Sequence, residues 1–486
     1  MTNNLPPHGT DFESEQTKSK LQYVLITAVY NRKSRLYTDN KFVLLINAPL
    51  SGLVDQTTFV AKTTNDSGHL QTNFALFRAA PPNIVCKWFT YLAVFDSAQH
   101  PNKLEIAYGG RQSVPVQFQL PYMKRHVHVG TCFSPLFLAE HWQLVVLAIE
   151  IYRHYGIQLQ VVYLMSAIEG VFEILQAYNS RDDIQLEPWA SIEIDGEIDN
   201  EINKEIDWRN QAASHTDCLL KYGYAAEFLI VGDMDDILIP ADHQTYYSEF
   251  IRNDYRHKKN AVGLLYSRFT VDITTTRNPR RFSLFDALTS AKVALYQPDD
   301  PKYVVNTSRA ESLWIHWPLN IKPNTSSRSV PSTDGRMLHF RNWHFLEDKN
   351  GILASENYMH RNVKNSAIWR SVALNESFLS TKTARQISRR FKSDIFKRNF
   401  GTFLKLPTKR MYAEMMAKCY DKIFYLHDKQ VTDCPGPHRC RINPINGLNC
   451  FIAKRKLIEQ ELAPGIFWYI SPKKGKFRFS NEGCSL

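Results

Sequence analysis

The sequence predicts an α/β fold for the middle of the chain, and the alternation of its apolar segments supports this prediction. Between residues 126 and 240, short apolar runs alternate with longer segments whose apolar residues recur every three or four positions. Strands that alternate with helices in this way favour βαβ units and a parallel sheet covered on both faces. The chain has 486 residues, 44% of them hydrophobic, so it is long enough for about two or three domains.

The first part of the chain lacks this alternation. Residues 1–20 are polar and are expected to form a flexible tail. Over residues 21–120, short apolar runs such as YVLITAVY and KFVLLINAPL are separated by polar stretches that contain Pro and Gly. Strands of this length with such turns are typical of a sandwich or barrel. We therefore expect a β-rich N-terminal domain over 21–120, with no catalytic constellation.

The α/β domain is expected to occupy residues 121–345. HVHVGTCF predicts a buried strand at 126–133, followed by a turn at Ser134-Pro135 and a helix over 139–155. LQVVYLM predicts the next strand at 159–165. A second helix over 168–178 and a short strand at 184–186 complete the predicted alternation.

An acidic stretch over residues 192–207 interrupts the pattern, and its charge favours an exposed insertion over a strand or an amphipathic helix. Trp208-Arg209-Asn210 then leads into QAASHTDCLLKYG, which predicts a helix that ends at Gly223. The apolar strand AEFLIVG follows, and the acidic motif DMDD comes directly after it.

The C-terminal region, residues 346–486, is expected to be basic and helical, with a loop rich in cysteine. KTARQISRRFKSDIFKRNF and KRMYAEMMAKCYDKIFYLH have helical periodicity. Cys434, Cys440 and Cys450 lie in a loop rich in Pro, Gly and Asn, where a disulfide would stabilise most. A zinc site with His427 or His438 is the alternative, less favoured because the sequence has no C-x2-C pair.

The formal net charge of +11 predicts an anionic partner or a solvated basic face beside the active site, and much of the excess lies in the C-terminal third. A positive field there would attract an anionic ligand and weaken with salt. The sequence shows no run of about 18 apolar residues and no signal-peptide pattern, so it encodes no visible membrane anchor.

Three carboxylates, Asp233, Asp235 and Asp236, stand where the apolar strand AEFLIVG leaves the sheet. Ligands of open α/β folds bind at this carboxyl edge. Carboxylates crowded together repel one another, and a divalent cation is the simplest remedy. Such an ion can bridge two phosphates and offset the charge on a leaving nucleoside diphosphate. Helix capping is the structural alternative, but a cap requires a single Asp.

The segment WRNQAASHTDCLLKYGYAAEFLIVGDMDDILIP resembles the core signature of glycosyltransferase family 92. CFSPLFLAEHWQLVVLAIEIYRHYG is similar to the first βα unit of this family, and RMLHFRNW to a downstream segment in which Phe340 replaces the usual Tyr. The likeness spans roughly residues 21–343 and is strongest over 132–240.

This resemblance implies a GT-A type nucleotide-diphospho-sugar transferase core with a Rossmann-like mixed sheet. It also implies galactose transfer from UDP-galactose to a glycan acceptor in the Golgi, with Mn2+, by a type II membrane protein. No nucleic-acid partner is expected. Asp233 and Asp235 match the D-x-D metal motif, with Asp236 as support. Five other residues are expected to contact the nucleotide: Arg209, Asn210, Asp217, Ser134 and Pro135.

A third protein ligand for the metal is expected downstream, because manganese accepts imidazole as well as oxygen. His339 is the first choice and His316 the second. An inverting transfer also needs a carboxylate that takes the proton of the acceptor hydroxyl. Glu311 and Asp286, which lie between the motif and His339, are the candidates for this base.

Two other functions remain open from the sequence. A strand followed by D-x-D also describes the nucleophile loop of haloacid-dehalogenase-like phosphohydrolases, although that motif normally opens its domain. Alternatively, the aromatic and basic segment GIFWYISPKKGKFRFS is compatible with a non-enzymatic protein that binds nucleic acid or acidic glycans.

Overall fold

The computed structural model describes most of the chain, and every structural statement below concerns these residues: 20–34, 36–49, 59–81, 83–194, 197–198, 200–241, 244–294, 299–331, 333–346, 353–357, 371–374, 378–425 and 433–486. The expected tail, apart from Lys20, lies outside this set, as does His427.

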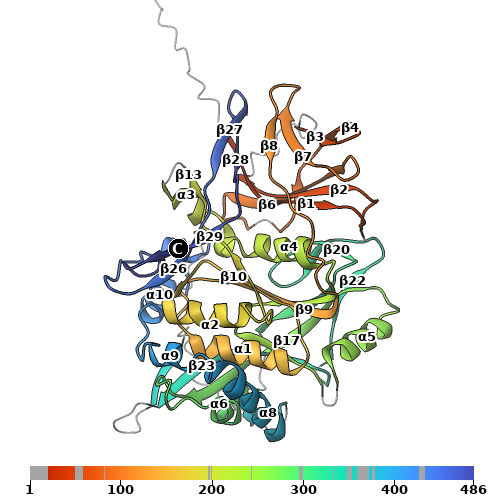
Figure 1. Ribbon diagram of the computed structural model, residues 1–486. Coiled ribbons are helices and arrows are strands. Elements are labelled where there is room, and N and C mark those ends of the chain that lie inside the picture. The colour runs from red at the N-terminus through yellow and green to blue at the C-terminus, as the bar shows by residue number, and fades with distance from the viewer. Residues whose placement is uncertain are drawn as a thin grey trace, which may run out of the picture.

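Two β-sheets form a sandwich at the N-terminal end (Figure 1). One has the strand order β27-β28-β1-β2-β6-β5 and the other β4-β3-β7-β8. Their shared core is aromatic, with Tyr23, Phe42, Phe59 and Trp468 buried together. The strands are β1 (Leu21–Asn31), β2 (Lys41–Pro49), β3 (Phe59–Asn65), β4 (Gly68–Phe74), β5 (Phe77–Arg78), β6 (Trp88–Asp96), β7 (Lys103–Tyr108), β8 (Val114–Val116), β27 (Ile458–Ala463) and β28 (Ile466–Ile470).

A mixed sheet of 12 strands forms the centre of the molecule. Its order begins β12-β10-β9-β15, four parallel neighbours, and continues with the antiparallel strands β19 and β17. The strands are β9 (Val127–Leu136), β10 (Gln160–Leu164), β12 (Gln185–Pro188), β15 (Ala226–Gly232), β16 (Asp236–Ile239), β17 (Ala261–Thr275), β18 (Lys292–Ala294), β19 (Asp299–Asn306), β22 (Ser326–Ser329), β23 (Arg336–Leu346), β24 (Leu353–Asn357) and β25 (Ser371–Ala373). The predicted alternation is therefore confirmed, and the fold is mixed α/β.

The helices cover both faces of this sheet. Helix α1 connects β9 to β10, and α2 lies between β10 and β12, so the chain moves in one direction along the sheet. Connections between parallel strands are almost always right-handed, so these two helices share a face. Helix α4 accompanies the return to β15 and lies on the other face, between the sheet and the N-terminal sandwich (Figure 1). The helices of this region are α1 (Trp142–His154), α2 (Glu169–Asn179), α3 (Asn200–Lys204), η3 (Asp207–Asn210), α4 (Gln211–Tyr222), α5 (Tyr246–Arg256) and α6 (Leu284–Ser290).

The C-terminal region contains the expected helices but also strands, so the expectation of a helical extension is correct only in part. The run IFWYI is aromatic and β-branched, and as β28 it pairs in parallel with β1. The elements are α8 (Thr381–Phe391), η4 (Lys392–Phe396), α9 (Phe400–Leu404), α10 (Ala413–Tyr420), η5 (Asp421–Tyr425), η6 (Pro437–Arg439), β26 (Cys450–Lys454) and β29 (Lys476–Ser480). Small sheets are formed by β26 and β29 with β11 (Ser166–Ile168), by β13 (Glu193–Ile194) with β14 (Glu197–Ile198), and by β20 (Ala310–Leu313) with β21 (Pro318–Ile321).

The acidic stretch 192–207 is not an exposed insertion where it is described. Ile192, Ile202 and Ile206 are buried together with Val24 and Trp88 of the sandwich. These isoleucines fall at irregular spacings along a charged segment, so neither helical nor strand periodicity marks them. The expectation fails because their partners come from a distant part of the chain.

All eight cysteines form disulfides: Cys86–Cys434, Cys132–Cys218, Cys419–Cys440 and Cys450–Cys484. The disulfide interpretation of the C-terminal loop is confirmed, and a zinc site there is excluded because no thiol is free. Cys86–Cys434 links the sandwich to the C-terminal loop, and Cys132–Cys218 links β9 to α4.

Within the described ranges, no helix is both long and apolar enough to cross a bilayer.

Candidate active site

The DMDD motif lies at the point where the strand order of the central sheet reverses. Strand β9 has β10 on one side and β15 on the other, so the chain leaves β9 and β15 in opposite directions. Ligands of open α/β sheets bind in the crevice outside the carboxyl ends of such a strand pair. Asp233 follows β15, and the next residues turn into β16, with the Asp236 amide donating to the Asp233 carbonyl at 3.0 Å.

Buried cations neutralise two of the three carboxylates. The Lys302 Nζ atom, whose side chain is 1% exposed, lies 2.9 Å from Asp233 and 3.7 Å from Asp236. Arg268 donates to both oxygens of Asp236 at 3.4 Å, and the Arg209 guanidinium is 3.5 Å from Asp233. The repulsion among the carboxylates is therefore relieved in part by the protein itself, so crowding alone does not require a metal ion.

The three carboxylates differ in their pKa values. Burial would raise the pKa of Asp233, but Lys302 and Arg209 outweigh it and hold this pKa well below its usual range. At Asp235, burial would again raise the pKa, but His339 outweighs this effect and lowers it. For Asp236, burial prevails over Arg268 and raises the pKa. The neighbouring groups thus favour the charged form at Asp233 and Asp235, whereas burial disfavours it at Asp236.

Asp235 and His339 form an open pair that could hold a metal ion. Strand β16 pairs antiparallel with β23, which sets Asp236 opposite His339. The His339 Nε2 atom is 3.2 Å from Asp235 Oδ2, and these side chains are 12% and 33% exposed. Asp235, Asp236 and His339 each offer one ligand atom within 4.8 Å of the others. Carboxylate oxygen with imidazole nitrogen is a donor set that suits manganese.

A cavity of about 730 Å³ opens over this pair. Its floor holds Asp233, Asp235, Lys302 and His339, and His316 lies on the same cavity. The His316 Nδ1 atom is 2.9 Å from the Pro301 carbonyl oxygen, which ties that nitrogen to the backbone. The structure thus brings both candidate histidines to one cavity, with His339 beside the carboxylates.

A strained turn carries Arg209 into the cavity. Trp208, Arg209 and Asn210 have positive φ angles of 42°, 54° and 63°. Each left-handed residue other than glycine costs roughly 1–2 kcal/mol, and such strain concentrates at functional sites. The turn is held from two sides. The Asn210 side chain exchanges hydrogen bonds with Asn47 of the sandwich at 2.6 and 3.1 Å, and the Trp208 amide donates to the Pro435 carbonyl at 2.7 Å.

Ser134 and Pro135 lie in the last residues of β9, not in a turn after it, so that prediction is corrected. The Ser134 hydroxyl is 3.0 Å from His215 Nε2, and the Gln211 amide donates both to this hydroxyl and, at 3.0 Å, to Asp233. Burial lowers the pKa of His215 to about 3, so the imidazole is neutral. This buried network orients Asp233, and the Pro135 carbonyl accepts from Arg209 Nε at 2.8 Å.

Other predicted site residues lie elsewhere. Asp217 and Asn210 line a second cavity of about 360 Å³ between α4 and the sandwich, and Asp217 binds Tyr163 at 2.6 Å and Lys221 at 2.7 Å. Arg209 lines both cavities. The two candidate bases are not in the main cavity: Asp286 is exposed on α6, and Glu311 packs beside Tyr37.

Three carboxyl residues on the main cavity have no role predicted from the sequence: Glu140, Asp207 and the exposed Asp300. Glu140 accepts hydrogen bonds from three backbone amides, those of Met411, Tyr412 and Ala413, so it is an anchor for helix α10. Asp207 accepts one hydrogen bond, from Asn83 at 3.2 Å, and burial raises its pKa to about 6. The only sequence signal for Asp207 was its place next to Trp208.

Comparison with known proteins connects this geometry to a family. The sequence model described as glycosyltransferase family 92 matches residues 127–394. The Caenorhabditis elegans glycosyltransferase family 92 protein F59C6.8 is 28% identical over 477 residues, which cover 95% of this chain and 88% of that protein. The C. elegans family 92 protein ZK381.2 is 29% identical over 361 residues, or 73% of this chain and 67% of that protein.

Among solved structures, Staphylococcus aureus TarS (residues 1–349) shares 10% sequence identity, over 37% of this chain and 48% of that one. The TM-score is 0.20, too low to support any argument about this chain. The family match is of a different kind, because it spans more than half of the 486 residues and includes the whole β9–β23 sheet path with its acidic motif. The chain therefore belongs to glycosyltransferase family 92.

Proposed function

We propose that this glycosyltransferase moves a hexose, most simply galactose from UDP-galactose, onto a glycan acceptor, with inversion and with a divalent cation such as Mn2+. Family membership makes the chain a glycosyltransferase and sets aside the phosphohydrolase and binding-protein alternatives. The donor, the metal dependence and the stereochemistry are the proposed part.

One observation supports the proposal above all others. At the reversal point of the strand order, an open carboxylate–imidazole pair, Asp235 with His339, lies on the same cavity as Arg209, Arg268 and Lys302. A nucleoside diphosphate carries its charge on two adjacent phosphates, so its site needs both cationic side chains and room for a metal ion. Such a mixed site is unnecessary for a neutral ligand.

The residues fit a divalent cation. Asp235 and His339 would hold it, and Asp236 offers a third ligand atom within reach of theirs. Asp233, which pairs with Lys302 and Arg209, is a proposed ligand through its place in the D-x-D motif. The bound ion would offset charge on the diphosphate as it leaves. Arg209 reaches the cavity from the strained turn and would orient the same diphosphate. Lys302 stabilises Asp233 from beneath.

Asp207 is the base that we propose for an inverting transfer. In this reaction the acceptor hydroxyl oxygen bonds to the anomeric carbon, the bond from that carbon to the diphosphate breaks, and the hydroxyl proton passes to a carboxylate. Glu140 is occupied by backbone amides, whereas Asp207 has one hydrogen-bond donor and a pKa near 6. Asp207 replaces Glu311 and Asp286 in this role.

We also infer that the enzyme acts in the lumen of the Golgi. Four disulfides that use every cysteine are typical of proteins that fold in an oxidising compartment. Immunolabelling of permeabilised cells with Golgi markers tests this inference, and a purely cytosolic signal would contradict it.

Donor screening tests the proposed reaction. Purified protein is incubated with a panel of nucleotide sugars, with Mn2+ or with EDTA, and release of nucleoside diphosphate is measured. We expect UDP-galactose to be hydrolysed fastest, and EDTA to abolish the reaction until Mn2+ is restored. Equal turnover in EDTA would remove the metal from the proposal. Preference for another donor would correct the sugar.

A further inference from the structure

One wall of the cavity comes from helix α10, outside the segment 127–394 that matches the family model. Five residues of this part of the chain line the cavity: Tyr412, Ala413, Met416, Ala417 and Tyr420. They recur at intervals of three and four, so they form one face of α10. None of them carries a charge, in contrast to the floor that holds Asp233, Asp235 and Lys302.

The opposite face of α10 bears the charges of this helix. Glu414 and Lys418 form an ion pair at 2.6 Å, with side chains 80% and 75% exposed. Amphipathic helices usually turn their apolar face toward a packed core. Here the uncharged face borders a cavity of about 730 Å³ instead, so part of it remains available to a ligand.

An aromatic cluster continues this wall. The ring of Trp208, from the strained turn, is 6.3 Å from the ring of Tyr420 and 6.2 Å from that of Phe424. Trp208 and Tyr420 both line the cavity. Aromatic faces of this kind pack against the C–H faces of sugar rings, and the polar tips of Tyr and Trp suit a half-hydrated ligand. Trp208 is followed by Arg209 and preceded by Asp207, so donor floor and apolar wall meet at this turn.

Helix α10 is rigidly placed. The Glu140 carboxylate accepts from the amides of Met411, Tyr412 and Ala413, where the helix begins. The Tyr412 hydroxyl accepts from the Cys484 amide at 2.7 Å. At the other end, Cys419 is bonded to Cys440. A binding surface fixed at both ends loses little conformational entropy when a ligand arrives.

We propose that the inner face of α10, with Trp208, is the acceptor site, and that the acceptor presents an uncharged saccharide to it. This inference rests on the proposed function, because it assumes that the donor and the metal ion occupy the floor of the cavity. The acceptor would then occupy the space beside α10. The class of ligand follows from the wall: an acidic sugar would place its charge against Met416 and Ala417 without a cation from α10. A neutral sugar with an apolar ring face fits instead.

Direct binding tests the proposal without any need for turnover. Saturation-transfer NMR is recorded on the full chain with N-acetyllactosamine as the neutral probe and a heparin disaccharide as the anionic one. We expect transfer to the neutral probe. Ala417→Trp, which fills the cavity, and Tyr420→Ala, which removes the ring, should each weaken its binding at least about tenfold, a change of about 1.4 kcal/mol.

The matched control is Lys418→Ala on the outer face of the same helix, which should bind as the wild type does. A second measurement, donor hydrolysis without acceptor, should stay within about twofold of wild type in Ala417→Trp and Tyr420→Ala. Thermal denaturation checks that each variant is folded. If Ala417→Trp impairs the fold, Tyr420→Ala provides the test.

The outcomes separate the two proposals. If the wild type hydrolyses a nucleotide sugar but the α10 variants bind the neutral probe normally, the acceptor inference is overturned and the proposed function stands. Preference for the anionic probe, or no saturation transfer to either, also overturns the inference. If no nucleotide sugar is hydrolysed while the variants lose the neutral probe, the saccharide site stands and the proposed reaction fails.

Discussion

The floor and the α10 wall of the main cavity are held in place by different interactions. The floor is an array of buried charges in which Lys302, Arg268 and Arg209 sit against Asp233 and Asp236. The α10 wall is uncharged and is held by backbone hydrogen bonds and a disulfide. Removing one partner of a buried charge pair costs several kcal/mol, whereas changing one apolar contact costs about 1–3 kcal/mol.

This difference predicts how tolerant each wall is. The floor fixes the position of a charged group, because each carboxylate orients a cation and the cations in turn orient a diphosphate. The α10 wall selects by shape. A substitution on the floor should therefore abolish turnover with every acceptor, whereas one on α10 should change which acceptors are used. The following predictions probe this contrast, beginning with the largest effect.

Asp235→Asn should lower donor hydrolysis and transfer by about 10³-fold, because the open carboxylate that faces His339 loses its charge. Steady-state release of nucleoside diphosphate with Mn2+ measures this loss. Asp286→Asn is the matched control, since this exposed aspartate lies outside the cavity, and it should retain full activity. An active Asp235→Asn enzyme would show that the floor does not work through a carboxylate-bound cation.

Asp207→Asn should reduce transfer by about 10²-fold, in line with loss of a general base. Burial raises the pKa of Asp207 to about 6. The base acts only when deprotonated, so wild-type kcat/KM should fall about tenfold per pH unit below that value. The surroundings of Asp207 are the Asn83 amide and the Cys86–Cys434 disulfide, and the nearby charges of Glu205 and Arg439 pair with each other at 2.8 Å.

The variant should also lose the acidic limb of the pH profile, which a merely structural role would leave in place. Donor hydrolysis by water should be affected less than transfer to a sugar, because Asp207 borders the acceptor side. A pH profile that is unchanged in Asp207→Asn would assign the limb, and the base, to another group.

The strained turn at residues 208–210 links the two walls of the cavity. Two substitutions of Asn210 can separate the contribution of its side chain to the free energy of unfolding from that of its backbone conformation. Asn210→Ala removes the amide pair with Asn47 and also places a less tolerant residue at a φ of 63°, so unfolding should become easier by about 2–3 kcal/mol. Asn210→Gly keeps the left-handed backbone and loses only the pair, which should cost about 1 kcal/mol. Denaturant unfolding compares the two variants. Equal losses would mean that the backbone conformation carries no strain.

Much of the central fold could be predicted because its signals are local. The strand β9, the helix α1 and the strand β15 each show their pattern within about a dozen residues. DMDD could be found because a buried strand directly precedes it. His339 was reached through the family resemblance, and its position beside Asp235 depends on the register of β16 and β23.

What the sequence could not reveal depends on distant partners. Lys302 is a lone lysine in a strand, and only the neighbouring β15 places it under Asp233. Asn210 looks like an ordinary helix start, yet its left-handed backbone is supported by Asn47, 163 residues away. The strand β28 pairs with β1 at the other end of the chain. The two proposed bases failed for the same reason, since distance along the sequence says little about which carboxylates reach one cavity.

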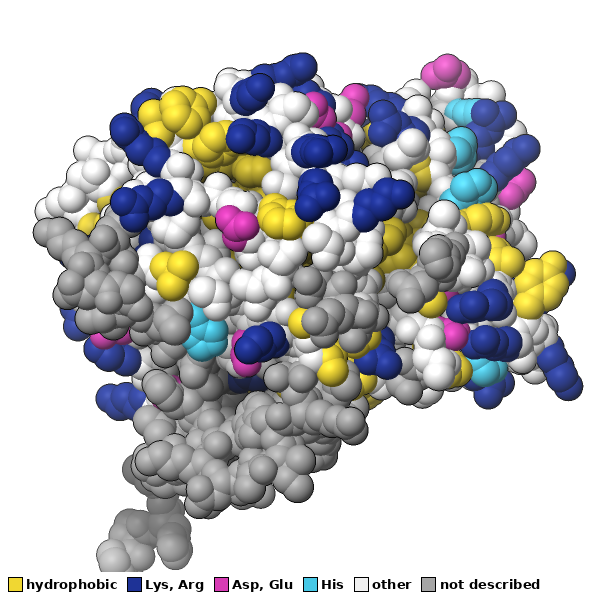
Figure 2. Space-filling model, turned by 90° about the horizontal axis from the view of Figure 1, so that it is seen from below, with side chains coloured by type: hydrophobic (Ala, Val, Ile, Leu, Met, Phe, Trp, Pro, Cys, Tyr) yellow, Lys and Arg dark blue, Asp and Glu magenta, His cyan; other side chains and the backbone are white. Residues whose placement is uncertain are grey.

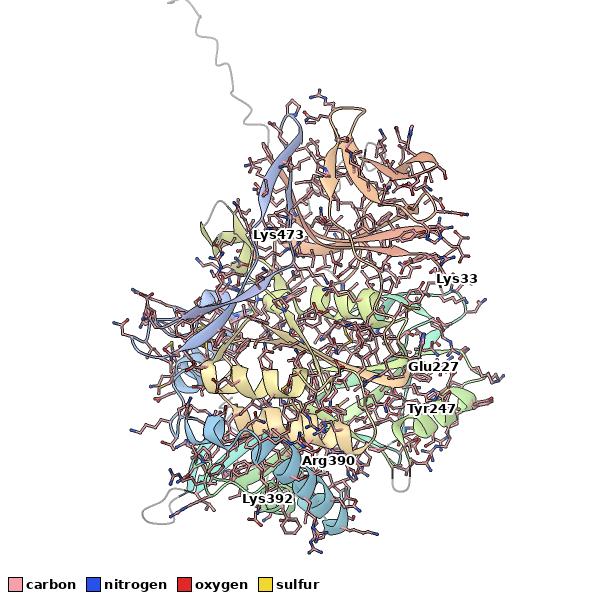
Figure 3. All side chains as sticks on the ribbon, viewed as in Figure 1. Lys33, Glu227, Tyr247, Arg390, Lys392 and Lys473 are labelled. Carbon is pink, nitrogen blue, oxygen red and sulfur yellow. A yellow bond between two sulfur atoms is a disulfide. The ribbon has the colours of Figure 1, made fainter. Side chains whose placement is uncertain are left out.

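The smallest expected effect concerns charge outside both walls. Residues 381–413 hold ten Lys and Arg against a single Asp, and the face seen in Figure 2 carries many more basic than acidic side chains. Figure 3 shows Lys392 near the end of α8, far from Lys33 on the N-terminal sandwich. Such a face attracts anions over about one Debye length, roughly 10 Å at 0.1 M salt.

Because this field adds to donor encounter without touching the donor, KM for the nucleotide sugar should rise only about two- to fivefold between 0.05 and 0.5 M NaCl, with kcat unchanged. Replacing Lys392, Lys397 and Arg398 with Glu should remove most of this salt dependence, whereas Arg32→Glu with Lys33→Glu should leave it intact. If both sets behave alike, the dependence arises from the buried floor or from net charge. The contrast between the buried floor and the exposed basic face would then be wrong, since exposed surface charge projects a field that salt can screen at this distance.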